Sequence, residues 1–159
     1  MKNIAGELSR IVEEFTVKIS AISDAEFSSK PKPEKWSKKE ILGHLVDSAH
    51  NNLRRFICGQ YESTPPHIAY DQNFWVDVNG YKDVAKEDVL QLWRLMNEHI
   101  CRVLNTMPPE KYMNECDMSN FSVQLRSLKW LAEDYVVHLK HHLNQIIPRS
   151  FDVVYKNDF

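Results

Sequence analysis

Residues 37–58, SKKEILGHLVDSAHNNLRRFIC, give the clearest indication of the fold. Ser37 and Glu40 have the spacing of a capping box, in which each side chain binds a backbone amide of the other residue. Apolar residues then recur three and four positions apart, as on one face of an amphipathic helix. Gly59 is a typical helix terminator. The pattern predicts a helix over 37–58 with an apolar face of Leu42, Leu45, Val46, Ala49, Leu53 and Phe56.

Three further segments show the same helical periodicity. The first covers about 3–22 and is followed by a break at 31–33, Pro-Lys-Pro; another covers about 84–107, before Pro108 and Pro109. The last begins at Ser127, a suitable cap, and ends before Pro148, since proline cannot continue a helix. Four helices of similar length predict an all-α fold, a single four-helix-bundle domain over 1–159.

The bundle would have long connections between helices 2 and 3 and between helices 3 and 4. The first, 60–83, contains two prolines and the aromatic residues Tyr70, Phe74 and Trp75; a connection this long is usually functional or forms a lid. The second reaches Arg126, and weak alternation over 121–125 predicts an extended segment there. The tail, 151–159, shows no periodicity.

Composition is that of one globular domain: 159 residues, 43% hydrophobic and 26% charged. A net charge of −2 gives no basic excess, so no nucleic-acid partner is expected. No apolar run approaches the ~20 residues that span a bilayer, and the N-terminus lacks the apolar core of a signal peptide. Three widely spaced cysteines form no zinc or redox motif. We therefore expect a cytoplasmic protein with free thiols and no membrane partner.

Histidine is the residue type that suggests chemistry, because two of the seven histidines share one helix face. His138 and His142 lie four positions apart, which places their Cβ atoms about 6 Å apart and lets both rings reach one metal ion. They also lie at the border of an apolar stripe, where they could simply form a polar edge, so the spacing leaves both interpretations open. A metal site needs a third ligand, for which the candidates are His44, His50, His67 and His99.

A polar row runs along the second helix, opposite its apolar stripe. The row contains His44, Ser48, Asn51 and Arg55, with Asp47 beside it. From periodicity alone, a solvent-exposed surface is the favoured interpretation of this row.

The stretch WSKKEILGHLVDS, residues 36–48, resembles the signature of the DinB-like superfamily, and more closely its YfiT-type branch. There a Trp-Ser/Thr opening leads eight residues later to a metal-binding histidine. The stretches 51–56, 70–72 and 135–146, together with Trp75, are similar to the same branch, so the resemblance covers about 30–147. It implies a four-helix bundle that often forms homodimers and binds one divalent metal ion, usually zinc or nickel, through His44, His138 and His142. One departure is Gln145, where the YfiT branch often has histidine.

The resemblance implies a metal-dependent hydrolase, or a transferase that adds a low-molecular-weight thiol such as bacillithiol to an electrophile. Three neutral imidazoles leave the charge of the ion and an open coordination position, which can lower the pKa of a bound water from about 15.7 to about 7 or hold a thiolate. Asp47 could orient a ligand histidine, and Asn51 and Arg55 could bind a small-molecule substrate.

Two other interpretations remain open: a non-catalytic metal-binding or stress-response protein that acts through partners, and a metal-free bundle with structural histidines. No GxSxG elbow, Cys-His signature or P-loop offers a rival catalytic site.

Overall fold

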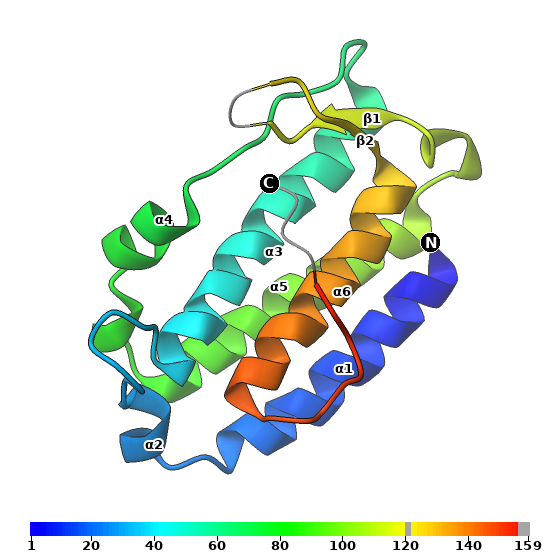
Figure 1. Cartoon of the computed structure of the whole chain (residues 1–159). Helices are drawn as coiled ribbons and strands as arrows, with labels where there is room; N and C mark the ends of the chain where they lie inside the picture. The colour runs from blue at the N-terminus through cyan, green and yellow to red at the C-terminus, as the bar shows by residue number, and fades with distance from the viewer. Residues whose placement is uncertain (120–121, 156–159) are drawn as a thin grey trace.

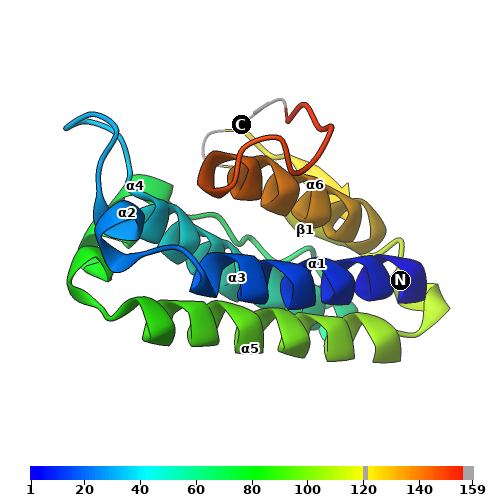
Figure 2. The same ribbon diagram turned by 90° about the horizontal axis from the view of Figure 1, so that it is seen from below.

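Four long helices form the bundle in the computed structural model, which describes residues 1–119 and 122–155. Helix α5 packs against α1 and α3, while α6 packs mainly against α3 and also contacts α1 (Figure 1). Seen from below, α5 and α6 lie on opposite sides of the molecule, with α1 and α3 between them (Figure 2). The predicted four-helix bundle is confirmed, and its helices are α1 (Lys2–Ser20), α3 (Lys38–Tyr61), α5 (Lys86–Thr106) and α6 (Leu128–Ile146).

Side-chain caps start both helices that carry the candidate ligands. Ser37 Oγ accepts a hydrogen bond from the Glu40 amide at 3.2 Å, and the Glu40 carboxylate accepts one from the Ser37 amide at 2.8 Å, so the predicted capping box is present. Ser127 Oγ accepts a hydrogen bond from the Trp130 amide at 3.2 Å, as a helix cap does.

Gly59 does not end α3, which continues to Tyr61. A Cβ atom at position 59 would lie 2.6 Å from a methyl carbon of Leu128. The predicted helix stop was therefore wrong, because this glycine serves the close packing of α3 against the start of α6.

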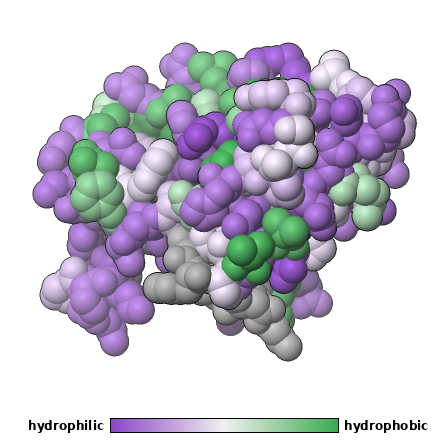
Figure 3. All heavy atoms as spheres, turned by 90° about the horizontal axis from the view of Figure 1, so that it is seen from above, coloured by the Kyte–Doolittle hydropathy of each residue, from purple (hydrophilic) through white to green (hydrophobic). Residues whose placement is uncertain are grey.

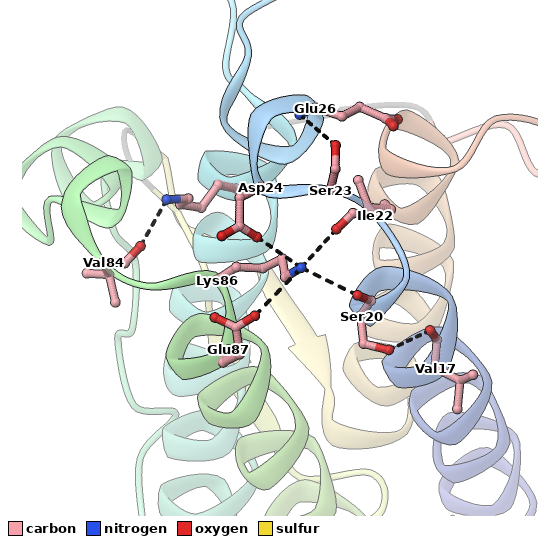
Figure 4. Close-up of polar contacts among 10 residues, drawn as sticks. Val17, Ser20, Ile22, Ser23, Asp24, Glu26, Val84, Lys86 and Glu87 are labelled. Atoms are coloured by element: carbon pink, nitrogen blue, oxygen red, sulfur yellow. Dashed lines mark hydrogen bonds and ion pairs between the residues drawn. The ribbon is translucent and has the colours of Figure 1, made fainter.

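Lys86 joins the end of α1 to the start of α5 (Figure 4). Its Nζ atom donates hydrogen bonds to the carbonyls of Ser20 and Ile22, at 3.4 and 2.8 Å, and forms ion pairs with Asp24 and Glu87 at 3.0 and 3.6 Å. Carbonyl groups after the last turn of a helix need such partners. Helix α1 ends two residues earlier than the periodicity predicted, and Lys86 binds carbonyl groups at this end.

Short elements occupy the connections. Helix α2 (Asp24–Ser28), which was not predicted, follows α1, and the connection over 60–83 contains α4 (Gln72–Val78) and the 3₁₀ turn η1 (Tyr81–Asp83). The second connection contains the 3₁₀ turn η2 (Pro109–Lys111) and strand β1 (Glu115–Asp117), which pairs antiparallel with β2 (Leu125–Ser127). Of the predicted extended segment 121–125, only Leu125 belongs to a strand, and Phe121 lies outside the described residues.

The tail after α6 turns back along that helix (Figure 1). The Asn144 side chain forms two hydrogen bonds of 2.9 Å with the backbone N–H and C=O of Phe151. The Phe151 ring stacks on Phe15 of α1 with their centroids 5.2 Å apart. Residues 147–155 are thus attached to the bundle, while 156–159 lie outside the described residues.

The core lies between the four long helices, and its largest fully buried side chains include Phe15, Phe56, Trp93 and Tyr135. Hydrophilic residues predominate on the face shown in Figure 3, where hydrophobic residues form small separate areas. Within the described ranges, no helix combines the length and the apolarity that crossing a membrane requires.

Candidate metal centre and adjoining cavity

Three histidines from two helices converge on one point. His44 Nε2 lies 3.2 Å from His138 Nε2. One ring nitrogen from each of His44, His138 and His142 lies within 4.8 Å of the other two. The three residues that the family resemblance implies as ligands are therefore brought together.

Antiparallel packing explains this convergence, because the first turns of α3 lie beside the last turns of α6 (Figure 1). His44 is 0% exposed, and the rest of its polar row is buried too, with Arg55 at 7%. The expectation of a solvent-exposed surface was wrong. Periodicity did not reveal that α6 and the connection over 60–83 cover this face of α3, where they contact Ser48, Asp47 and Arg55.

Hydrogen bonds orient two of the three rings. His138 Nδ1 lies 3.4 Å from Ser48 Oγ, and His142 Nδ1 lies 3.2 Å from the side-chain oxygen of Gln145. An amide oxygen accepts hydrogen bonds, so this contact requires Nδ1 of His142 to carry the proton and leaves the lone pair on Nε2. His44 Nδ1 is buried without a hydrogen-bond partner among the described residues. The Gln145 amide nitrogen also lies 3.0 Å from Nε2 of His141.

Burial keeps the three histidines neutral. It lowers the pKa of His44 to about 3, with a smaller contribution from the nearby His142. Burial lowers the pKa of His142 to about 4, and it holds the pKa of His138 well below the ordinary value, assisted by its histidine neighbours. Neutral imidazole is the form that binds metal ions, so the cluster is ready to bind one at neutral pH.

The donor set fits a divalent transition-metal ion. Zinc–imidazole bonds of about 2.0–2.1 Å in a tetrahedron require nitrogens roughly 3.3–3.4 Å apart, close to the 3.2 Å between His44 and His138. Zinc and nickel both accept imidazole ligands.

Asp47 is bound to the connection that covers α3. One of its carboxylate oxygens accepts hydrogen bonds from the Tyr81 hydroxyl at 2.7 Å and the Asn79 amide at 3.0 Å. The other oxygen is buried and has no partner among the described residues, and burial raises the pKa of Asp47 to about 6. Its orientation of a ligand histidine stays a prediction.

A cavity of about 500 Å³ opens beside His138. Of the two residues predicted to contact a substrate, Arg55 lines the cavity, whereas Asn51 is 1% exposed and donates its side-chain hydrogen bond to the Asp47 carbonyl. The cavity is lined by Ser48, Asn52, Arg55, Ala69, Tyr70, Asp71, Gln72, Asn73, Met118, Asp134, Tyr135, His138 and Tyr155.

Asp134 and Tyr155 are cavity residues that the sequence analysis did not identify. Asp134 precedes His138 by four positions and so shares its helix face, a signal that the sequence contained. Tyr155 comes from the tail, which has no periodicity. Its ring lies 5.2 Å from that of His138, and its hydroxyl donates a hydrogen bond of 3.4 Å to Asp134.

The other candidate histidines do not join the cluster. His50 is exposed, with its ring 5.7 Å from that of Trp75. His67 donates a hydrogen bond of 2.7 Å to the carbonyl of Ser119, and His99 is exposed on α5.

Fold and cluster together define a helical bundle with a candidate three-histidine metal centre. The chain belongs to the DinB superfamily, whose family model matches residues 7–146.

Comparison with known proteins gives YfiT of Bacillus subtilis, which is 21% identical over 145 residues, 89% of this chain and 81% of YfiT. The solved structure of YfiT, described as a probable metal-dependent hydrolase with an unusual four-helix bundle topology, matches with a TM-score of 0.77 at 20% identity, over 89% of this chain and 83% of that one. A mycothiol-dependent maleylpyruvate isomerase matches with a TM-score of 0.70 at 9% identity, over 97% of this chain and 62% of the isomerase. These structural matches show a shared fold.

Proposed function

We propose that this protein is a divalent-metal-dependent enzyme that acts on a small molecule. His44, His138 and His142 are the metal ligands, and zinc or nickel is the metal. The observation that carries the proposal is the convergence of three neutral imidazoles, within 4.8 Å of one another, beside a cavity of about 500 Å³. Cavities of roughly 300–1,000 Å³ typically bind small molecules.

A divalent ion in such a site acts as a Lewis acid that makes a bound water or thiol a nucleophile at neutral pH. The protein's own side chains hold the ligands in place. Ser48 and Gln145 contact Nδ1 of His138 and His142, and the Trp36 ring lies 5.2 Å from that of His44. The Tyr155 ring packs edge-on against the ring of His138 from the tail side.

Two reactions use this kind of site. Hydrolysis of a small molecule is supported by the relation to YfiT, described as a probable metal-dependent hydrolase. Transfer of a low-molecular-weight thiol to an electrophile is supported by the thiolate that the same open coordination position accepts. A non-catalytic metal-binding protein that acts through partners is the candidate from a different class.

The test measures both reactions with the metal-loaded, metal-depleted and reloaded protein. One arm follows conjugation of a thiol to a monochlorobimane-type electrophile, and the other follows hydrolysis of small ester and amide substrates. We expect one activity to disappear on metal removal and in His142→Ala, to return on reloading, and to persist in the control His99→Ala.

Equal rates with and without metal would overturn the proposed metal-dependent reaction. Full metal binding without turnover in either arm would support the non-catalytic protein instead. Homodimer formation, a cytoplasmic location and the lack of a nucleic-acid partner stay predictions.

A further inference from the structure

Two opposite charges in the cavity beside His138, the Arg55 guanidinium and the Asp134 carboxylate, do not pair with each other. Arg55 comes from α3 and Asp134 from α6, and both line the cavity. Each affects the pKa of the other through space. Among the described residues, however, neither forms an ion pair within 4.0 Å.

Arg55 is buried against neutral oxygen atoms. Its Nε and Nη2 atoms donate hydrogen bonds of 3.0 and 2.6 Å to the carbonyl of Ile68, and Nη1 donates one of 3.3 Å to the side-chain oxygen of Asn52. These bonds satisfy three of its five donors and leave its charge without an opposite charge in contact. A buried, unpaired charge is costly, so a ligand carboxylate at this position would be favourable.

Asp134 has a weak partner, the Tyr155 hydroxyl at 3.4 Å. Burial raises the pKa of its carboxyl, and the Tyr155 hydrogen bond and the more distant charges of Arg55 and Arg126 offset this only in part. Its neighbour Glu133 differs, because it is exposed and pairs with Lys129 at 3.9 Å. The other cavity acid, Asp71, is exposed and caps α4 by accepting two backbone hydrogen bonds of 3.0 Å.

We propose that this cavity selects zwitterionic small molecules, which carry an amino and a carboxylate group as amino acids and short peptides do. The ammonium binds Asp134 and the carboxylate binds Arg55. Asp134 lies one helical turn before His138 and two turns before His142. An ammonium bound to Asp134 therefore lies within the length of about two helical turns of the histidine cluster. This inference rests on the proposed function, because it places the reacting end of the ligand at that cluster.

The test uses Co²⁺-loaded protein and four thiols that differ in their charged groups. L-homocysteine has both groups, 3-mercaptopropylamine has the ammonium, 4-mercaptobutyrate has the carboxylate, and 1-propanethiol has neither. Thiolate-to-cobalt absorption gives the affinity of each. We expect L-homocysteine to bind most tightly, with each charged group contributing about tenfold.

Asp134→Asn should remove the advantage of the two amine-bearing thiols and leave the affinities of the other two unchanged. The matched control, Glu133→Gln, should leave all four affinities unchanged. Equal binding of all four thiols by the wild-type protein would overturn the inference and leave thiol coordination at the metal intact. Bound cobalt without thiolate absorption from any probe would overturn both this inference and the thiol-transfer reaction.

Discussion

Nε2 of His44 lies 3.2 Å from Nε2 of His138, although 94 positions separate the two residues in the chain. This contact exists because α3 and α6 pack antiparallel, so the site is a product of the α3–α6 interface. Packing and ligand geometry are therefore linked. Changes in the residues that fix α3 should affect both stability and metal binding.

Gly43 should be required for the packing of the turn that carries His44. A Cβ atom at position 43 would lie 2.2 Å from a carbon of the Tyr81 ring, which is buried and bound to Asp47. We expect Gly43→Ala to lower the free energy of unfolding by about 1–3 kcal/mol, as measured by urea denaturation.

Gly6→Ala is the matched control, since it lies on α1 and, apart from its own helix backbone and chain neighbours, no described residue comes within 4 Å of the added carbon. It should raise the stability by about 0.5–1 kcal/mol, because alanine favours the helix. A Gly43→Ala protein as stable as the wild type would contradict the packing that the structure shows.

Gln145 should act as a positioning residue for His142. Its side-chain oxygen holds Nδ1 of that ring at 3.2 Å, and loss of such a partner typically costs 10–100-fold in metal affinity. We therefore expect Gln145→Ala to weaken zinc binding by about 10–100-fold, as measured by competition with a chromophoric chelator. Gln91→Ala, an exposed glutamine on α5, should bind zinc as the wild type does. Equal affinities for all three proteins would rule out this role.

Acid should destabilise the metal-free protein. The folded-state pKa values of His44 and His142 are lowered to about 3 and about 4, and that of His138 is also lowered, so the unfolded chain binds more protons below pH 6.5. The contribution of the three neutral histidines to the free energy of unfolding is complete above pH 6.5 and is lost progressively as the pH falls. Asp47 acts in the opposite sense, because its pKa is raised from 3.8 to about 6 and its contribution falls as the pH rises through that range.

Three histidines outweigh the two carboxyl groups whose pKa is raised, Asp47 and Asp134, so the net effect should be a loss of stability between pH 6.5 and pH 4. Urea denaturation at several pH values in the presence of a chelator measures it. His138→Gln should make the free energy of unfolding depend less steeply on pH, and His99→Gln, at an exposed position, should leave this dependence unchanged. A stability that rises on acidification would contradict this assignment.

Local features of the chain were predictable from the sequence. The capping box of Ser37 and Glu40 and the shared face of His138 and His142 each depend on residues within one helical turn, where spacing determines geometry. The four long helices follow from apolar periodicity in the same way. The short helices α2 and α4 lack enough repeats to show a period.

The environment of His44 could not be predicted from periodicity, which identifies an apolar stripe and says nothing of what covers the opposite face. That cover comes from His138 of α6, which contacts His44, and from Tyr81 and the Ile68 carbonyl in a connection without a helical pattern, which contact the rest of the polar row. The family resemblance was the signal that indicated His44. Tyr155, which completes the cavity from the tail, left no signal in the sequence.

Metal content is the measurement that tests the central claim most directly. Elemental analysis of the purified wild-type protein should find close to one zinc or nickel ion per chain. His142→Ala should lose this ion, and the adjacent His141→Ala, which removes a histidine outside the cluster, should keep it. Full metal retention in His142→Ala, or the absence of metal from wild-type protein reloaded with either ion, would contradict the three-histidine site.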